Sequence, residues 1–311
     1  MNIVFLGTPL FAKEILEGLA ANHNILAAIT QPDKPFGRKK ILKAPEVKEY
    51  AIASNIPCFQ PEKSIEIAPI LHDIHRQNNI DAIVVVAYGN ILTKEVVTQY
   101  ICLNLHGSLL PHYRGASPVQ TSIINNYKHF GLSVICMDLG LDSGKIAALK
   151  PIESQIVMRK NLTEVFHILV PYGIDLLQNV LLNIKQNTLC TTPQDHTQAT
   201  YCPKLSKKDC YIDFIESYRC YLRYLALEHI GIWTFYKGMI LKINSISDYI
   251  EDTSHEQQGI ILAIDKNSMC ISCKKGALWI ESVTPQNKSK MTATSFLQSQ
   301  GLKVGDILPL G

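Results

Sequence analysis

The sequence predicts an α/β protein with a mainly parallel sheet, followed by a small antiparallel β-barrel. First, apolar strand-like and helix-like segments alternate through residues 1–185, a pattern typical of parallel sheets. Second, residues 186–202 are rich in Thr and Gln and have neither helical nor strand periodicity, which indicates a linker. Third, residues 203–311 contain one helical segment and then short strands separated by turn residues. We therefore expect two domains joined by this linker.

The first domain begins with the strand-like segment Asn2–Leu6 and continues into a segment with apolar residues at helical spacing. Thr8 is expected to cap that helix, with Pro9 at its first position. Residues 82–87 form a continuous, largely β-branched run, which is typical of a strand covered on both faces. Pro171 is expected to interrupt a helical pattern. The other expected elements are strands at 25–30, 56–59, 101–105 and 132–137, and helices near 45–55, from 118 onward, and at 161–184.

The second domain is expected to open with a helix and to continue as an antiparallel barrel. The helical pattern covers residues 215–227. The expected strands are 232–235, 239–243, 259–264, 269–273 and 277–283.

The composition limits the class of protein. Hydrophobic residues make up 47% and charged residues 18%, which predicts a folded globular chain. We find no apolar run close to the roughly 18–20 residues that a membrane span needs, and no secretory leader, so we expect no membrane association. Nine cysteines, an odd number in a long chain, indicate reduced thiols and a cytoplasmic location. The net charge of +3 requires any nucleic-acid site to be local.

Asn104 and His106 are the first candidates for catalysis. Residues two apart on a strand point to the same face, so an amide and an imidazole would lie side by side at the carboxyl end of a strand, where α/β sheets bind ligands. The amide can stabilise an oxyanion, and the imidazole can move a proton near neutral pH. The glycine-rich loop after the next strand offers Asp138 and Asp142 to hold the imidazole, and Asp142 lies deeper in it. Alone, this pattern also fits a structural histidine with hydrogen-bond partners.

A basic segment is the one place where we expect a local nucleic-acid site. It spans residues 33–44, where Asp33 is the only acid, and on its own it also fits a solvated surface. Its cations are Lys34, Arg38, Lys39, Lys40 and Lys43.

The order of residues after His106 is unusual and carries a family resemblance. The run Ser108-Leu-Leu-Pro-His-Tyr-Arg-Gly-Ala-Ser-Pro118 resembles the 10-formyltetrahydrofolate-dependent formyltransferases, and most closely those that act on methionyl-tRNA. The segments Val84–Gly89 and Gly140–Gly144 match the same family. Shorter matches occur at Phe5–Pro9, Gln31–Asp33 and Lys204–Lys207, so the resemblance covers nearly the whole chain.

The resemblance implies a Rossmann-like formyltransferase domain followed by an OB-like barrel. It implies that Asn104, His106 and Asp142 carry catalysis, with 10-formyltetrahydrofolate as the formyl donor and no metal. An amine would attack the formyl carbon, Asn104 and His106 would stabilise the oxyanion, and Asp142 would orient His106. The folate site is assigned to Ser108, Leu109, Leu110 and Pro111, and to the backbone of Val86, Ala87, Tyr88, Gly89, Asp138, Gly140 and Leu141.

The basic segment decides the acceptor, because several members of the family share the catalytic residues. The run Lys34–Lys43 resembles the loop that the tRNA-specific members place against the acceptor stem. The resemblance therefore implies that Arg38, Lys39, Lys40 and Lys43 bind tRNA and that initiator methionyl-tRNA is the acceptor. We expect a monomer.

Four alternatives remain open at this stage. A nucleotide-sugar formyltransferase would share the folate chemistry but would not need the cationic loop. An NAD-dependent oxidoreductase is disfavoured because Gly7-Thr-Pro9 lacks the Gly-x-Gly-x-x-Gly pattern. A non-enzymatic RNA-binding protein would leave Asn104 and His106 unexplained. A zinc site at Cys270 and Cys273 has no second pair at suitable spacing, and strand alternation explains both residues.

Overall fold

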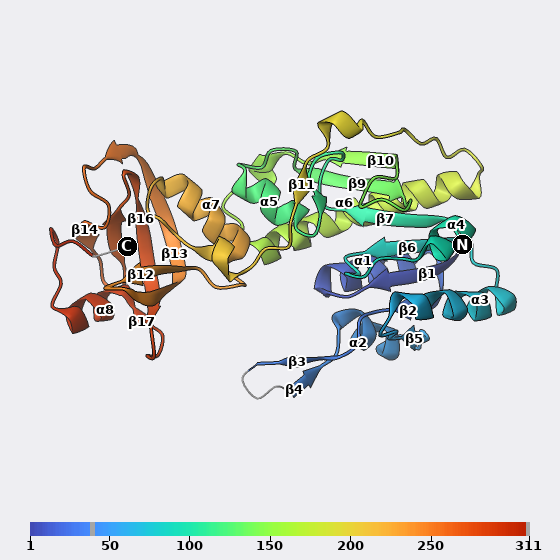
Figure 1. Ribbon diagram of the computed structural model, residues 1–311, viewed down its shortest axis with the longest axis horizontal. Coiled ribbons are helices and arrows are strands. Elements are labelled where there is room, and N and C mark those ends of the chain that lie inside the picture. The colour runs from blue at the N-terminus through green and yellow to red at the C-terminus, as the bar shows by residue number, and fades with distance from the viewer. Residues whose placement is uncertain (38–40, 309–311) are drawn as a thin grey trace. The chain divides into compact units, whose positions relative to one another are not determined.

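The protein is described here by a computed structural model that covers residues 1–37 and 41–308. The chain forms two compact units (Figure 1). Unit 1 consists of Met1–Val119, His129–Met158 and Thr163–Pro203, and unit 2 consists of Gln120–Lys128, Arg159–Leu162 and Lys204–Gly311.

A seven-stranded sheet forms the centre of unit 1, with the strand order β10-β9-β7-β6-β1-β2-β5. Its strands are β1 (Asn2–Gly7), β2 (Asn24–Ile29), β5 (Cys58–Phe59), β6 (Ala82–Val86), β7 (Cys102–His106), β9 (Gly131–Cys136) and β10 (Lys145–Pro151). Neighbours from β5 to β7 pair in parallel, whereas β9 is antiparallel to both β7 and β10. The prediction of a mainly parallel sheet is confirmed, and the antiparallel edge is an addition to it.

Helices connect these strands. They are α1 (Leu10–Ala20), α2 (Glu46–Ala53), α3 (Ile67–Gln77), α4 (Lys94–Gln99), α5 (Pro118–Ile124) and α6 (Leu162–Lys185), with short 3-10 helices η1 (Ser64–Glu66), η2 (Ser154–Ile156) and η3 (His196–Gln198). The prediction that Thr8 caps the first helix is wrong, because α1 begins at Leu10 and Pro9 occupies the capping position. The Thr8 hydroxyl instead donates to the carbonyl of Tyr88, 2.9 Å away, and so ties β1 to the end of β6.

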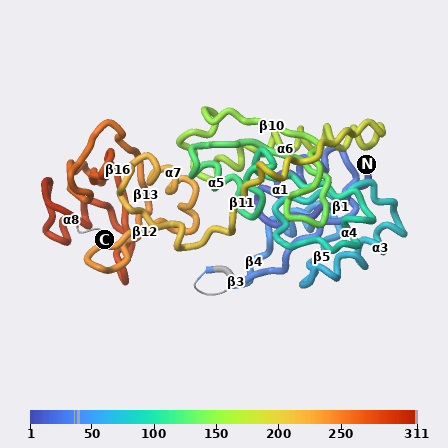
Figure 2. The backbone as a smooth tube through the Cα atoms, turned by 45° about the horizontal axis from the view of Figure 1, so that its top comes forward, coloured from blue at the N-terminus to red at the C-terminus, as the bar shows by residue number. Residues whose placement is uncertain are grey.

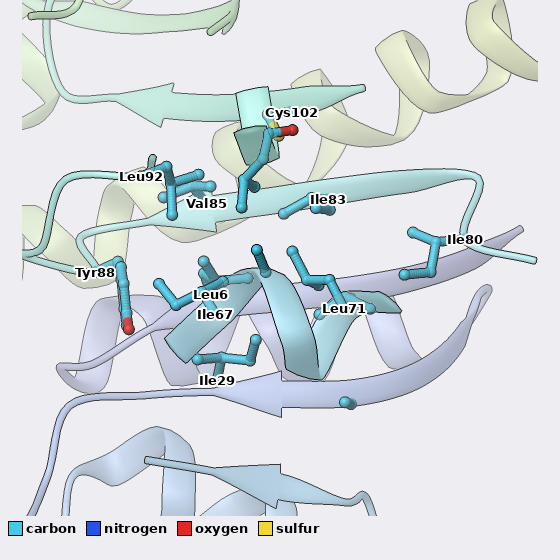
Figure 3. Packing of buried hydrophobic residues seen from close by; sticks show 14 residues of the cluster. Leu6, Ile29, Ile67, Leu71, Ile80, Ile83, Val85, Tyr88, Leu92 and Cys102 are labelled. Carbon is cyan, nitrogen blue, oxygen red and sulfur yellow. The ribbon is translucent and has the colours of Figure 1, made fainter. Parts of the chain in front are cut away.

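One face of the sheet packs against α3 and α4. Figure 3 shows Leu6, Ile83 and Val85, from β1 and β6, beside Ile67 and Leu71 of α3. The two α3 residues are completely buried. Since burying one such side chain contributes about 1.5–3 kcal/mol, this cluster holds α3 against the sheet.

The same face carries the candidate catalytic residues of β7. Cys102 belongs to the cluster of Figure 3. Alternate residues of a strand share a face, so Asn104 and His106 point to the side that Cys102 occupies. This was the expectation from their spacing.

The opposite face of the sheet is covered by α1 and α6. The rings of Phe11 and Phe166 join the two helices, with centroids 5.1 Å apart. A Cβ atom at Gly173 would lie 2.9 Å from both Ile15 of α1 and Leu105 of β7. A glycine at this position therefore lets α6 approach its two neighbours closely.

The helix α6 is continuous over 24 residues and contains Pro171, so the predicted interruption is wrong. Buried residues on both sides of the proline, including Val165, Leu169 and Leu177, pack this helix along its length. One 18-residue window of α6 has a mean hydropathy of 1.5 and is 39% buried. By length and composition alone α6 could cross a membrane, a test that core helices also pass.

The basic segment forms a small hairpin. Its strands β3 (Lys34–Phe36) and β4 (Ile41–Lys43) pair antiparallel, and Figures 1 and 2 show them extending away from the sheet of unit 1. Arg38, Lys39 and Lys40, predicted to bind tRNA, lie outside the described residues.

The segment expected to be a linker, residues 186–202, lies within unit 1. The backbone of Thr192 exchanges two hydrogen bonds with Ile146 of β10, at 2.8 and 2.9 Å. Farther on, β11 (Tyr201–Cys202) pairs in parallel with β8 (Arg114–Gly115). These contacts bring the segment to the loops around the catalytic candidates.

Unit 2 contains an antiparallel sheet with the order β12-β13-β16-β15-β14, and β17 pairs with β16. The prediction of a small antiparallel β domain is confirmed, although β13 is much longer than the expected 239–243. The elements are η4 (Lys207–Cys210), α7 (Ser217–Leu227), β12 (Trp233–Tyr236), β13 (Met239–Ser254), β14 (Ile261–Ile264), β15 (Met269–Ser272), β16 (Lys275–Pro285), β17 (Met291–Thr292) and α8 (Ala293–Gln300).

Candidate active site

The antiparallel direction of β9 determines how the candidate aspartate reaches β7. Cys136, at the end of β9, pairs with Leu103 near the start of β7. The loop 137–144 therefore leaves the sheet beside the amino end of β7 and not at the carboxyl ends of the parallel strands. It returns across the face of β7 and brings Asp142 to Asn104 and His106.

Asp142 divides its two carboxylate oxygens between the other two candidates. Oδ1 accepts a hydrogen bond from Asn104 Nδ2 at 3.2 Å. Oδ2 lies 3.7 Å from His106 Nδ1 and accepts a hydrogen bond from the Gly115 amide at 2.8 Å. The side chain of His106 is only 5% exposed and that of Asp142 only 14%, so water screens these interactions weakly. The three predicted residues thus meet in one place.

The second contact of His106 defines its hydrogen positions. Nε2 lies 2.9 Å from the Tyr113 carbonyl oxygen, which can only accept, so Nε2 carries a hydrogen. Nδ1 faces the carboxylate of Asp142, which is an acceptor when ionised. Both ring nitrogens therefore face oxygen acceptors.

The backbone of Asp142 adopts an unusual conformation for a residue with a side chain. Its φ is +49°, in the left-handed region where non-glycine residues are uncommon. Next to it, a Cβ atom at Gly144 would lie 1.9 Å from the carbonyl oxygen of Cys136, so only glycine fits there. The loop is closely constrained by the end of β9.

Asp138, the other acid of this loop, does not join the cluster. Among the described residues, its carboxylate contacts only its own loop, accepting from the Gly140 amide at 3.0 Å and from Ser143 Oγ at 2.7 Å. Leu139 and Leu141 are 64% and 58% exposed. The part of the loop predicted to line the folate site is therefore open to solvent.

The predicted folate segment Ser108–Pro111 follows β7 and is tied to β9. Ser133 Oγ donates to the Ser108 carbonyl at 2.6 Å and accepts from the Leu110 amide at 3.0 Å. The Ser108 hydroxyl donates to the His112 carbonyl. Ser108 and Leu110 are buried, so this segment can offer a ligand its backbone and its less buried members, Leu109 and Pro111.

The second predicted folate segment, Val86–Gly89, lies at the carboxyl end of β6, which is parallel to β7. The side chains of Val86 and Tyr88 are buried, whereas Ala87 and Gly89 are exposed and have positive φ values of 45° and 87°. The Tyr88 carbonyl accepts from Thr8 and Gln31. The exposed backbone of Ala87 and Gly89 is the part available to a ligand.

Lys43, the one described residue of the predicted tRNA-binding set, is exposed on β4. Its ammonium lies 2.6 Å from Glu46, and this hydrogen bond raises the pKa of Lys43. Lys43 is therefore charged at neutral pH and can approach a phosphate.

Two residues near the cluster had no role in the sequence analysis. Arg114 stood within the quoted motif without a function, and Gln194 stood in the expected linker. Gln194 donates through Nε2 to the carbonyls of Asp142 and Gly144, at 2.8 and 2.7 Å. Nothing in the local pattern around Gln194 signals this contact, because it depends on the path of the chain across β10.

No group of three or more His, Cys, Asp or Glu side chains that could hold a metal occurs within residues 1–37 and 41–308. Cys270 and Cys273 are both buried in unit 2. Burial raises the pKa of the Cys270 thiol to about 11, which disfavours the thiolate that zinc requires.

Family models match both parts of the chain. A formyl transferase model matches residues 1–164, and a model of the formyl transferase C-terminal domain matches residues 204–301. The first model alone covers more than half of the chain.

Similar proteins of known name align over almost the full length. The methionyl-tRNA formyltransferase of Helicobacter pylori (strain P12) is 40% identical, over 99% of this chain and 100% of that protein. The methionyl-tRNA formyltransferase of Caldicellulosiruptor saccharolyticus is 37% identical, with the same coverage.

Solved structures share the fold at lower identity. HypX from Aquifex aeolicus in complex with tetrahydrofolic acid is 16% identical, with a TM-score of 0.65 over 99% of this chain and 49% of that chain. An N-formyltransferase from Helicobacter canadensis, in complex with folinic acid and dTDP-3-aminofucose, is 19% identical, with a TM-score of 0.63 over 91% of this chain and 99% of that one.

Proposed function

Because the chain belongs to the formyltransferase family, we propose that it transfers the formyl group of 10-formyltetrahydrofolate to the amino group of methionine on initiator methionyl-tRNA. The observation that carries this proposal is that Asn104 and His106 both lie beside the carboxylate of Asp142. It occurs in a chain that aligns over 99% of its length with a relative named methionyl-tRNA formyltransferase. The product, N-formylmethionyl-tRNA, serves translation initiation.

Asn104 is assigned to the oxyanion. The attacking amine forms a C–N bond with the formyl carbon, and the formyl oxygen becomes negatively charged in the tetrahedral intermediate. Asn104 Nδ2 carries two hydrogens, and the described contacts use one of them, on Asp142. That contact fixes the plane of the amide, so the second hydrogen can donate to the oxyanion.

His106 is assigned to proton transfer. When the intermediate collapses, the bond between the formyl carbon and N10 breaks, N10 gains one proton, and the former amine has lost one. The Tyr113 carbonyl beside Nε2 can neither supply nor take up this proton. We therefore assign the transfer to Nδ1, which lies 3.7 Å from Asp142 Oδ2, beyond hydrogen-bond distance, and which would take the proton from the amine and pass it to N10. Formylated methionyl-tRNA and tetrahydrofolate are the balanced products.

Folate is proposed to bind along Ser108–Pro111, Val86–Gly89 and the loop containing Asp138, Gly140 and Leu141. We assign catalysis to residues 1–185 and additional RNA affinity to residues 203–311, with 186–202 between them. Arg38, Lys39, Lys40 and Lys43 are proposed to contact the tRNA acceptor stem.

We further propose a cytoplasmic monomer. The nine cysteines all lie in the described part of the chain and form no disulfide, and six of them are buried, which suits a reducing compartment. Analytical ultracentrifugation tests the monomer directly.

A formyl-transfer assay tests the proposed activity. The purified protein is given 10-formyltetrahydrofolate and charged initiator tRNA, with charged elongator tRNA and a 3-amino nucleotide sugar as parallel acceptors. We expect N-formylmethionine on the initiator tRNA and much slower reaction with the other two. Formylation of the amino sugar alone would assign the chain to the sugar-modifying branch, and no formylation of any acceptor would reject the activity.

A further inference from the structure

Gln194 is a buried polar residue inserted beside the catalytic cluster. It is 6% exposed, and the backbone pairing of Thr192 with Ile146 fixes the chain two residues before it. Its amide nitrogen donates to the carbonyls of Asp142 and Gly144. One side chain thus spans both ends of the short turn that carries the catalytic carboxylate.

Arg114 holds the other end of the Gln194 side chain. The guanidinium is buried, at 3% exposure, and donates to Gln194 Oε1 through Nε at 3.1 Å and through Nη2 at 2.7 Å. Nη2 also lies 3.2 Å from His196 Nδ1. No ion pair between Arg114 and a carboxylate occurs in the described part of the chain. Because the two contacts come from a planar fork, they fix which end of the Gln194 amide faces the loop.

This orientation matters because the backbone of Asp142 lies in the sparsely populated left-handed region, where contacts from neighbouring residues help to keep it. Its φ of +49° is unfavourable for a residue with a Cβ atom, and its own loop offers the carbonyls of Asp142 and Gly144 no strand partner. The Gln194 amide supplies that partner. Without it, the turn could relax and carry the carboxylate away from Asn104 and His106.

We propose that Gln194 is a positioning residue for catalysis and that Arg114 orients it. The pair fixes the backbone of the Asp142 loop from outside the catalytic cluster, through a segment that sequence analysis treats as a linker. This inference rests on the proposed function only in its rate prediction, because the position of the loop can be measured without the reaction.

The test compares three variants. Gln194→Met keeps the length of the side chain and removes every polar contact. Gln194→Glu keeps an acceptor for Arg114 but replaces the amide donor with oxygens that cannot bond to the two carbonyls. Gln198→Met is the matched control, because Gln198 is exposed and its side chain donates to Asp195 and to no other residue within the described ranges.

The kinetic readout is formyl transfer at saturating 10-formyltetrahydrofolate over a range of charged tRNA concentrations. For Gln194→Met and Gln194→Glu we expect kcat to fall by about 10-fold to 100-fold with KM nearly unchanged, because the reacting groups are misplaced while the binding surfaces remain. Gln198→Met should match the wild type. A thermal scan of Gln194→Glu checks that the Arg114 contact still supports the fold.

The second readout is hydrogen exchange at the Gly115 amide, which donates to Asp142 Oδ2. We expect faster exchange in both Gln194 variants and wild-type exchange in Gln198→Met. Wild-type exchange and wild-type kcat in folded Gln194→Met would overturn the proposal, and so would a rise in KM with kcat unchanged. If the wild-type protein transfers no formyl group, the proposed function fails, while the exchange experiment still tests the positioning role.

Discussion

The catalytic cluster and the basic hairpin, both in unit 1, are built in opposite ways. In the cluster, His106 and Asp142 are largely buried, and each also contacts the backbone, His106 at the Tyr113 carbonyl and Asp142 at the Gly115 amide. On the hairpin, Ile41 and Leu42 are 67% and 66% exposed, and its two strands have three residues each. Under the proposed function, the comparison sets a buried, fixed arrangement of polar groups, suited to chemistry, against an exposed surface, suited to contact with a large partner.

The largest effect is expected from removing a side chain to which catalysis is assigned, Asn104 for the oxyanion or His106 for proton transfer. His106→Ala and Asn104→Ala should each lower kcat by about 10²-fold to 10³-fold. The loss should be the same at low and high salt, because buried groups are weakly screened. Measuring kcat at two ionic strengths, with circular dichroism to verify the fold, checks both statements. Turnover near the wild-type level in the two variants would remove these residues from the mechanism.

Replacing the arginine of the basic segment should affect tRNA recognition more than turnover. Arg38→Ala is expected to lower kcat/KM for initiator methionyl-tRNA by about 10-fold, corresponding to one good contact with a base edge. The loss should be smaller for charged elongator tRNA, and kcat at saturation should change little. Arg76→Ala, at an exposed arginine of α3, is a control for the loss of an arginine elsewhere. Equal losses on both tRNAs would make Arg38 part of a non-selective electrostatic surface.

Point charges on the same hairpin should produce a smaller and less selective effect. The double variant Lys39→Ala, Lys40→Ala should weaken binding of both tRNAs alike, by less than about 10-fold. It should also reduce the slope of log Kd against log salt concentration. The reduction should correspond to the loss of up to about two phosphate contacts, since fewer counterions are released. Fluorescence titration at several salt concentrations gives the slope. An unchanged slope would show that neither lysine approaches a phosphate.

The same contrast explains what could be predicted from the sequence. The strands β1, β6 and β7 were predicted because most of their residues are apolar and buried, so the pattern of side chains reflects their environment. The edge strand β10 and the hairpin strands β3 and β4 were not predicted. Most of their residues are at least partly exposed, so these strands can form without an alternation of apolar residues. The helix α6 continues through Pro171 because packing on both sides outweighs the roughly 3 kcal/mol cost of the proline.

The sequence predicted that Asn104, His106 and Asp142 lie together, but not which other parts of the chain hold them. Spacing alone places Asn104 and His106 on one face of β7. The direction of β9 and the path of Gln194 across β10 depend on tertiary packing, and a local pattern contains neither. The meeting of the three candidate residues could therefore be predicted, whereas the contact of Gln194 with their loop could not.

The smallest effect, a slight change in unfolding temperature, is expected from Asp33 at the base of the hairpin. Asp33, just before β3, accepts hydrogen bonds from Lys48 of α2 at 2.8 and 2.9 Å and from Gln60 at 2.7 Å. The bond from Lys48, and then the bond from Gln60, lowers the pKa of Asp33 below its ordinary value of 3.8. This carboxylate links the chain on either side of the hairpin, so it can position the exposed strands through one partly exposed ion pair.

Asp33→Asn keeps the shape of the side chain and removes its charge. Because the pKa of Asp33 is lower in the folded state, its contribution to stability is complete above about pH 3.8 and is lost as the pH falls through the folded-state value. The wild type should therefore unfold at a slightly higher temperature than Asp33→Asn at neutral pH, by at most about 3 °C, since exposed pairs contribute little. Calorimetry from pH 7 to pH 3 should show this difference shrinking only at the acid end.

The control is Asp73→Asn, which breaks an exposed pair with Arg76 within a single helix and should leave the KM for tRNA unchanged. A change in kcat for Asp33→Asn, rather than a small rise in the KM for tRNA, would mean that the hairpin and the catalytic cluster are not separate in function.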